Sequence, residues 1–333
     1  MIEGEDAAPE AVRPTVGLVD ALALPIEWLR PPAGDLAAAR AAIDTSDTTL
    51  FGATSGRSAP ALFHLRWGKA TYANVRPARW RPGYRSPLAR PEAIDLVIVR
   101  ENLEDLYVGI EGDLAALAPL RLAAWGTPLA DLGPGRFALK VITERGTERV
   151  VRFAFELARR RTARKVTCGT KHNMLRQSDG LFRDVALRVA REYPDVRYES
   201  FIVDDLARRL VQTPDELDVV VLPNLYGDVL SDAAAGVIGG LGLAPSGCYG
   251  DGYAYFEPAH GSAPDLAGKG VINPTATILS AVMMLDHLGF AAGARRLEQA
   301  VERVYADGAP LTPDQGGSAG TLEFAAAVER RLA

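Results

Sequence analysis

The chain has 333 residues and a formal net charge of −5, and 48% of its residues are apolar. This length suggests about two domains, and the apolar fraction suffices for a substantial core. The acidic balance excludes the electrostatic footprint of a nucleic-acid-binding protein, and no apolar run reaches the roughly 18 residues that span a membrane. The acidic start, Met1–Asp6, lacks the features of a signal peptide, and Cys168 and Cys248 imply no disulfide framework. A cytoplasmic protein is therefore expected.

The predicted elements alternate between strands and helices after residues 1–14, which are expected to form a disordered leader. The predicted strands are Thr15–Val19, Thr49–Gly52, Leu96–Val99, Lys165–Cys168, Arg197–Ile202 and Val219–Leu222. Helical spacing of apolar residues predicts helices at Glu148–Arg161, Asp179–Glu192 and Pro274–Gly289. This alternation indicates an open α/β sheet with largely parallel pairing. The weakly patterned residues 113–138 are interpreted as an excursion, and an arm that pairs with another subunit is one form it could take.

Two aspartates four residues apart follow the last of these strands. The strand ends in a Pro-Asn turn, and a helical pattern begins near Gly227, so Asp228 and Asp232 lie on one helical face. Like charges at this spacing repel unless a cation lies between them. Oxygen ligands alone favour Mg²⁺ or Mn²⁺ over zinc. A lone pair of this kind usually consists of two solvated acids, but the small and apolar residues 233–243 predict a buried helix here.

Three arginines are candidate ligands for carboxylates. Arg66 and Arg76 flank the segment 67–75, and Arg100 ends the apolar run Ile94–Val99. Ligands of open α/β sheets usually bind at the carboxyl ends of strands, which is where Arg100 is expected. Because arginine makes bidentate bonds to carboxylates, the three together predict a site for a di- or tricarboxylate. Taken singly, each arginine is more often a surface residue.

A series of motifs occurs in a fixed order between residues 50 and 290. They are Tyr72–Pro77, Arg100–Glu111, Ile142–Glu144, Lys171–Asn173, Asp204, Pro223–Asp232, Glu257–Asp265 and Asn273-Pro274. In this order they resemble the metal-dependent decarboxylating β-hydroxyacid dehydrogenases, which include isocitrate, isopropylmalate, homoisocitrate and tartrate dehydrogenases. The resemblance is nearest to the 3-isopropylmalate dehydrogenase-like members.

The resemblance implies a fold and an assembly. An isopropylmalate dehydrogenase-like open sheet in two domains is expected, with the active-site cleft between them. Residues 1–90 plus 240–333 would form the large, cofactor-binding domain, and residues 91–239 the small domain for metal, substrate and dimerisation. Both termini would lie in the large domain, and the working unit would be a homodimer with shared active sites.

The resemblance also implies a metal site and an anion clamp. Asp228 and Asp232 would bind Mg²⁺ or Mn²⁺, and Asp204 would complete the site from the partner subunit. The metal would chelate the 2-hydroxyl and the adjoining carboxylate of a small hydroxy-dicarboxylate substrate. Arg66, Arg76 and Arg100 would hold the substrate carboxylates.

Two further residues would supply acid–base chemistry by the same resemblance. Lys171, again from the partner subunit, would help remove the hydroxyl proton, and Tyr107 would protonate the enol carbon. Alone, Tyr107 would be interpreted as a core tyrosine and Lys171 as a solvated lysine. The surrounding motifs favour the functional interpretation of both.

The chain has no G-x-G-x-x-G motif after a strand and no P-loop, so its nucleotide site must be of another kind. One loop resembles the adenosine-binding loop of the family, and Glu257 would lie near the junction of metal and cofactor. The loop consists of His260, Gly261, Ser262, Ala263, Pro264, Asp265 and Leu266, followed by Asn273, which would read adenine. A carboxylate at position 265 would accept a bond from a ribose 2′-hydroxyl and repel a 2′-phosphate, so NAD is predicted.

The start of the chain departs from the family pattern. Family members open with a strand, a Gly-Asp-Gly-Ile-Gly-Pro-Glu loop beside the nicotinamide, and a long helix. Residues 15–28 run on without these features. About one strand-loop-helix unit is therefore expected to be shortened or absent.

The residues that would read the variable group of the substrate also depart from the pattern. Isocitrate enzymes have Ser and Asn just before the first clamp arginine, whereas this chain has Leu62 and Phe63. Asn173 and Met174, on the partner's Lys171 segment, would also face the substrate. Leu62, Phe63 and Met174 predict an apolar pocket, which suits an alkyl or aryl group better than a third carboxylate. Arg57 and His64 are the counter-evidence, since either could reach a polar substituent.

These observations predict an NAD-dependent oxidative decarboxylase of a 3-substituted malate, with isocitrate, homoisocitrate or tartrate-type activity as the alternative. A non-catalytic regulatory subunit is the alternative from another class. Such subunits typically lose the lysine, the tyrosine or a metal acid, and this chain keeps all three.

Overall fold

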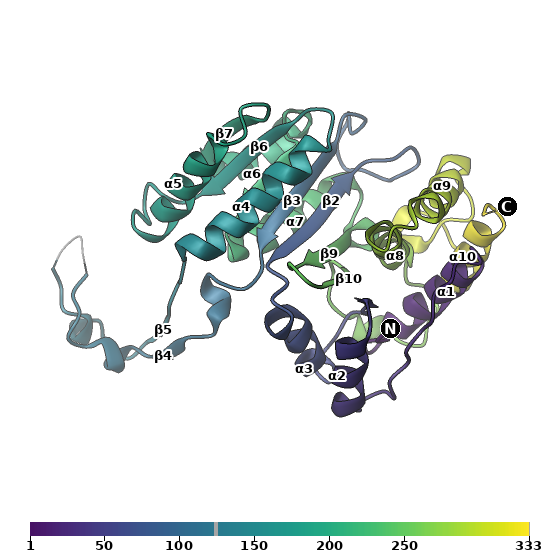
Figure 1. Cartoon of the computed structure of the whole chain (residues 1–333), viewed down its shortest axis with the longest axis horizontal. Coiled ribbons are helices and arrows are strands. Elements are labelled where there is room, and N and C mark those ends of the chain that lie inside the picture. The colour runs from purple at the N-terminus through teal and green to yellow at the C-terminus, as the bar shows by residue number, and fades with distance from the viewer. Residues whose placement is uncertain (123–125, 333) are drawn as a thin grey trace.

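A computed structural model describes residues 1–122 and 126–332, and its centre is one eight-stranded sheet (Figure 1). In sheet order the strands are β1 Thr48–Leu50, β10 Ala254–Pro258, β9 Pro245–Tyr249, β2 Ala73–Arg79, β3 Asp95–Glu101, β8 Val219–Leu222, β6 Lys165–Thr170 and β7 Arg197–Ile202. The pairs β1–β10, β3–β8, β8–β6 and β6–β7 are parallel, and the other three are antiparallel. The predicted open α/β fold is confirmed.

Alternate residues of the central strands pack into two different cores. On β3, Val97 and Val99 join one core with α4 (Glu144–Arg159) and α5 (Ser178–Ala190). Leu96 and Ile98 join the other core with α6 (Val203–Gln212) and α7 (Asn224–Ile238). Because successive strand residues point to opposite faces, a strand covered on both sides must be apolar at nearly every position. This is why the runs 96–99 and 219–222 are continuously hydrophobic.

The other half of the molecule brings the two ends of the chain together (Figure 1). Helix α1 (Ala8–Asp20) contacts α10 (Thr321–Glu329) and the buried α8 (Thr275–His287), and α9 (Ala291–Asp307) packs on α8 and α10. A smaller core joins Phe51, which follows β1, and the strands β9 and β10 to α2 (Leu36–Thr45) and α3 (Ala59–Phe63). The division into domains 1–90 plus 240–333 and 91–239 stays a prediction. No helix in the described residues is long and apolar enough to cross a membrane.

Two predictions about the start of the chain are wrong. Residues 1–14 are ordered: Ile2 pairs in parallel with Phe51, and α1 begins at Ala8. The predicted strand Thr15–Val19 is the second half of that helix. Its residues have high β-propensity, but the buried positions Ala8, Ala11, Val12, Thr15, Val16, Leu18 and Val19 follow a helical period, and packing of that face overrides propensity. An isolated strand bridge, a loop and a 13-residue helix are therefore present, so of the two outcomes expected for the opening unit, shortened or absent, absence is wrong.

Glu5 holds the loop that precedes α3. Its buried carboxylate accepts hydrogen bonds from Thr54 Oγ1 at 2.7 Å, Ser55 N at 2.8 Å and Ser58 N at 2.7 Å. Burial alone would raise the pKa of Glu5, but these hydroxyl and amide donors outweigh it and lower the pKa to about 2.

We expect Glu5 to make the protein acid-sensitive. A carboxyl whose pKa is lower in the folded state stabilises above its unfolded pKa and loses that contribution as pH falls. The free energy of unfolding should thus drop by about 3 kcal/mol between roughly pH 5 and pH 2 on account of Glu5. Urea titrations should show a flatter pH dependence for Glu5→Gln. Glu3, which is partly exposed and paired with Arg13 at 2.8 Å, is the control, and Glu3→Gln should keep the wild-type slope. Equal slopes for all three proteins would contradict this role.

Residues 109–139 project from the body as an arm (Figure 1). Its two strands, β4 (Glu111–Asp113) and β5 (Arg136–Ala138), form an antiparallel pair separate from the main sheet. The excursion predicted at 113–138 is therefore present, apart from residues 123–125, which lie outside the described part. Its pairing with another subunit stays a prediction.

Candidate functional site

The centre of the candidate site forms where α7 crosses β2 and β3. Arg76 on β2 and Arg100 on β3 are buried, and both point at the first turns of α7. Gly227 permits this close approach, because a Cβ there would lie 2.6 Å from the Cβ of Arg100. The helix therefore needs glycine immediately before Asp228.

The two arginines and the two aspartates form one ionic cluster. Arg76 Nη1 lies 3.2 Å from Asp228 Oδ1, 3.2 Å from Asp232 Oδ1 and 2.7 Å from Ser231 Oγ. Arg100 Nη1 also pairs with Asp228 Oδ1. Both carboxylates lie on one face of α7, as predicted, and the structure shows that this face meets the two arginines.

Tyr107 joins this cluster through Asp228. Its hydroxyl donates to Asp228 Oδ2 at 2.5 Å, and the guanidinium of Arg100 lies 4.9 Å from the ring centre. Burial raises the pKa of Tyr107, and the bond to Asp228 adds to the rise. The hydroxyl consequently keeps its proton at neutral pH.

The pKa values of the two aspartates move apart. Burial alone would raise the pKa of Asp228, but Arg100, Tyr107 and Arg76 outweigh it, and the pKa falls. The pKa of Asp232 rises because burial exceeds the opposing effect of Arg76. Asp228 is thus the more strongly stabilised anion of the pair.

Arg66 approaches the same region from the π-helical turn His64–Gly68. Burial alone would lower its pKa, but Tyr255 and Glu257 beside it raise it. Burial raises the pKa of Glu257, and Arg66 and Arg76 oppose that rise. Glu257 is therefore close to these arginines, and its place near the junction of metal and cofactor stays a prediction.

The predicted cofactor loop borders a cavity of about 470 Å³. His260, Gly261, Ser262, Ala263, Leu266 and Asn273 line it, and Pro264 and Asp265 lie in the short turn Pro264–Leu266 beside them. The side chain of Asn273 is engaged elsewhere, since Nδ2 donates to Asp314 Oδ2 at 2.9 Å and Oδ1 accepts from Thr275 N. Contact of Asn273 with adenine would therefore use its backbone groups.

Lys171 and Asp204 pair with each other. Lys171 Nζ lies 2.5 Å from Asp204 Oδ1, and hydrogen bonding from Lys171 lowers the pKa of that carboxyl. Among residues 1–122 and 126–332, no group of three His, Cys, Asp or Glu could hold a metal. Within a single chain, Asp204 therefore does not form a three-carboxylate site with Asp228 and Asp232.

The residues predicted to form an apolar pocket stay largely separate from the ionic cluster. Leu62 packs against the core of α2 and α3, and Phe63 is 53% exposed and lies edge-on to Trp67. Asn173 is exposed, and Met174 is 71% exposed. His64 bonds Asp44 at 2.9 Å and Arg57 is exposed, so neither lies in the ionic cluster. The apolar pocket stays a prediction that depends on Met174 of a second subunit.

Several residues near the site had no sequence prediction. Asn224 accepts from Arg100 Nε at 2.7 Å, and Ser231 bonds Arg76. Glu10 on α1 accepts from Gly268 N at 2.6 Å and Gly270 N at 2.8 Å, and so holds the end of the cofactor loop. The signal for α1 was Pro9 followed by a helical period, since proline favours the first turn of a helix.

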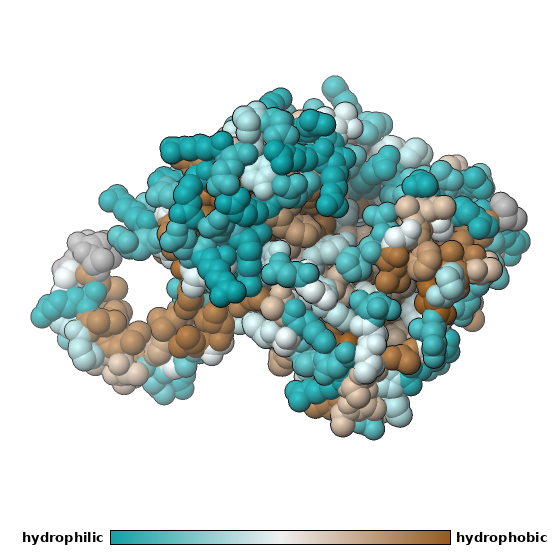
Figure 2. All heavy atoms as spheres, viewed as in Figure 1, coloured by the Kyte–Doolittle hydropathy of each residue, from teal (hydrophilic) through white to brown (hydrophobic). Residues whose placement is uncertain are grey.

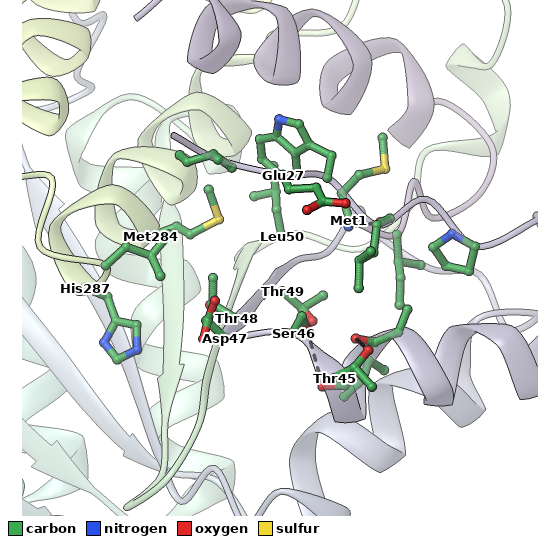
Figure 3. A pocket seen from close by; sticks show the side chains of 18 of the residues that line it. Met1, Glu27, Thr45, Ser46, Asp47, Thr48, Thr49, Leu50, Met284 and His287 are labelled. Carbon is green, nitrogen blue, oxygen red and sulfur yellow. Dashed lines mark hydrogen bonds between the residues drawn. The ribbon is translucent and has the colours of Figure 1, made fainter. Parts of the chain in front are cut away.

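A larger cavity, of about 700 Å³, lies away from this chemistry (Figure 3). Met1, Thr45–Leu50, Met284 and His287 are among the residues that line it, and no residue of the ionic cluster does. It opens beside the edge strand β1, so its size alone does not make it the candidate site.

Two buried arginines lie against a pair of helical aspartates, beside a loop-lined cavity in an open α/β sheet. These groups could hold a small polycarboxylate, a cation and a cofactor. The family model described as isocitrate/isopropylmalate dehydrogenase matches residues 27–328. The chain belongs to this family, whose members are decarboxylating dehydrogenases that act on a CH–OH group.

Individual relatives match almost the full length. A 3-isopropylmalate/3-methylmalate dehydrogenase of Methanocaldococcus jannaschii is 43% identical over 100% of this chain and 98% of its own. An isocitrate/homoisocitrate dehydrogenase of Thermus thermophilus is 42% identical over 100% and 97%. The crystal structure of isocitrate dehydrogenase from Methylococcus capsulatus superposes with a TM-score of 0.83, at 35% identity over 99% and 98% of the two chains. This full-length similarity also argues against a missing opening unit.

Proposed function

We propose that this protein catalyses the NAD-dependent, divalent-metal-dependent oxidative decarboxylation of a 3-substituted malate, resembling 3-isopropylmalate, to a 2-oxo acid and CO₂. The observation that carries the proposal is the ionic cluster of Arg76, Arg100, Asp228 and Asp232. In the described residues, the buried Nε atoms of Arg66 and Arg76 have no hydrogen-bond partner. Such donors are available for the carboxylates of a bound substrate.

The residues present fit a divalent cation. Asp228 and Asp232 offer only oxygen ligands, and both remain partly exposed, which suits Mg²⁺ or Mn²⁺. Asp204 of a second subunit would add a third carboxylate. When bound, the cation would supply Lewis-acid chemistry that lowers the pKa of the substrate hydroxyl.

Each remaining step of the proposed reaction is assigned to particular side chains. Arg66, Arg76 and Arg100 would hold the substrate carboxylates and fix the orientation of the reacting carbons. The partner subunit's Lys171 would accept the hydroxyl proton. The 260–266 loop would hold NAD, which would supply the oxidant for this step. After loss of CO₂, Tyr107 would donate its proton to the substrate carbon, which its raised pKa permits because the proton is retained at neutral pH.

The cofactor would lie in the 470 Å³ cavity beside the 260–266 loop. Asp265 is exposed in the turn between Ala263 and Leu266, which line this cavity, and could accept a hydrogen bond from a ribose hydroxyl. The loop is held at its far end by Glu10, so its position does not depend on the cofactor alone.

The arm is the surface we assign to dimerisation. Ile110, Leu120, Leu132 and Leu139 lie on or beside it and are 40–54% exposed. Figure 2 shows apolar residues gathered along the arm, away from the polar surface of the body. Apolar side chains on a projecting segment have no core of their own to join, so a second copy of this chain is the partner we propose.

If the active sites are shared between subunits, a mixture of two inactive chains should regain catalytic activity. Lys171→Ala and Asp228→Asn should each be inactive as homodimers, because each lesion affects both sites. After subunit exchange at equal amounts, half of the dimers should be mixed and each should keep one intact site, so roughly a quarter of wild-type activity should return. Activity that stays at the homodimer level after exchange is verified by mass spectrometry would show that the sites are not shared.

Substrate preference should follow the apolar residues at the reading positions. A carboxylate beside Leu62, Phe63 and the partner's Met174 would lose hydration without gaining a partner, whereas an alkyl group would gain from burial. We therefore expect kcat/KM for 3-isopropylmalate, or a similar alkylmalate, to exceed that for isocitrate by about tenfold or more. NADH formation with Mn²⁺ across a panel of 3-substituted malates measures this.

The relative from Thermus thermophilus makes isocitrate or homoisocitrate turnover the second candidate. If either turns over faster than the alkylmalates, the apolar pocket is wrong. Loss of that preference in Arg57→Ala would identify the arginine that supplies the missing charge. A panel with no turnover, together with retained binding of NAD, would favour a regulatory subunit.

A further inference from the structure

A buried ionic cluster lies outside the residues assigned so far. Lys140 Nζ lies 2.8 Å from Asp105 Oδ1 and 3.1 Å from Asp179 Oδ1, and it lies 4.4 Å from the ring centre of Tyr226. The lysine side chain is 12% exposed, and both carboxylates are fully buried. Two buried carboxylates without a cation would be strongly unfavourable, so the three groups form one unit.

One side of the cluster holds the loop that carries Tyr107. Asp105 Oδ2 accepts from Leu225 N at 2.9 Å, in the first turn of α7, and the backbone of Asp105 pairs with Val141. Asp105 has a φ of 68°, which is uncommon for a residue other than glycine. Its side-chain bonds thus offset an unfavourable backbone conformation two residues before Tyr107, and they join this loop to the helix of Asp228.

The other side of the cluster holds the segment that carries Lys171. Asp179 lies in the first turn of α5, and its Oδ2 accepts from Lys171 N at 2.6 Å. The same carboxylate therefore contacts the Lys140 ammonium through one oxygen and the backbone of Lys171 through the other. A change in the position of Asp179 would move the segment from which Lys171 extends.

The geometry points to Lys140 as a positioning residue that couples the two active sites of a dimer. It joins the Tyr107 loop and the Lys171 segment of one chain through Asp105 and Asp179. This inference rests on the proposed function, in which Tyr107 serves its own chain's site and Lys171 serves the neighbouring one. Displacement of Lys140 would then impair the acid of one site and the base of the other.

Lys140→Met is the test variant, because it removes the cation and keeps an apolar chain of similar length. Lys165→Met is the matched control, since Lys165 is also buried and pairs with Glu199 at 2.7 Å, at the opposite end of β6 from Lys171. Both variants should lower the melting temperature. Only Lys140→Met should lower kcat, by about tenfold or more, as expected when reacting groups are misplaced.

Mixed dimers consist of a test chain and a second chain and are purified through two different affinity tags. They measure the effect of Lys140 on Lys171 separately from its effect on Tyr107. When the second chain carries Lys171→Ala, the one working site uses the Lys171 of the test chain. When the second chain carries Asp228→Asn, the one working site uses the Tyr107 of the test chain. Introducing Lys140→Met into the test chain should lower kcat in both kinds of dimer, relative to dimers whose test chain is wild type.

The outcomes are distinct. A loss in only one kind of dimer, or a lower melting temperature without loss of kcat in either, would overturn the coupling. A mixture of Lys171→Ala and Asp228→Asn chains that stays inactive after verified subunit exchange would show that sites are not shared, which overturns the coupling together with that part of the proposed function. If Lys140→Met does not fold, Asp179→Asn serves instead: it should lower kcat only where the test chain supplies Lys171, and an equal loss in both kinds of dimer would contradict the proposal.

Discussion

Asp228→Asn should lower kcat/KM by about 10³-fold or more, the largest effect that we expect from a single substitution. The carboxylate of Asp228 contacts Arg76, Arg100 and Tyr107 at once. An amide of the same shape removes the charge that these groups share, leaves the buried guanidinium group of Arg100 without its anion and weakens a proposed ligand of the cation. The loss should persist at saturating substrate, because the affected groups hold the reacting atoms as well as the carboxylates.

The measurement is initial-rate NADH formation at several Mn²⁺ concentrations. The proposed role in cation binding predicts that the Mn²⁺ concentration for half-maximal rate rises in Asp228→Asn. Asp205→Asn is the control, since Asp205 is also a partly exposed helical carboxylate paired with arginine, at 2.9 Å from Arg209, but lies on α6, outside the ionic cluster. It should keep wild-type kinetics. A loss below tenfold for Asp228→Asn, with unchanged Mn²⁺ dependence, would remove Asp228 from the site.

NAD should be preferred over NADP by about a hundredfold in kcat/KM, because an added 2′-phosphate would meet the carboxylate of Asp265. The repulsion acts at an exposed loop, so it should weaken at high ionic strength, whereas a steric exclusion would not. Initial rates with both cofactors at two salt concentrations separate these causes.

Asp265→Ser should reduce the preference for NAD mainly by improving use of NADP. Asp307→Ser is the control, since Asp307 is an exposed carboxylate on α9 that pairs with Arg331 at 2.6 Å. Equal efficiencies of the wild-type enzyme with NAD and NADP would refute the assignment. An unchanged preference in Asp265→Ser would place the discrimination in another residue.

The parts of the fold that could be predicted from sequence are those with a strong local signal. The runs 96–99 and 219–222 are apolar at every position because both faces of their strands are covered, and they are β3 and β8. The helix of Asp228 follows from a turn and a period of 3.6, and the spacing of four residues places Asp228 and Asp232 on one face. The order of the motifs was enough to predict the family, because a motif depends on which residues are present and not on how they pack.

The opening helix and the linkage around Lys140 needed the tertiary structure. Residues 15–19 carry β-branched side chains that favour a strand locally, and only their packing against α8 and α10 stabilises the helix. The three partners in this linkage, Lys140, Asp105 and Asp179, are distant from one another in sequence. No local pattern therefore marks them as partners. Their pairing arises from the way the arm, the Tyr107 loop and α5 converge, since buried charges are stable only where the fold brings opposite charges together. Sequence by itself thus determined the family, five of the eight strands of the described sheet and the residues of the ionic cluster. Tertiary packing alone decided the helical start of the chain and which buried charges hold the site in place.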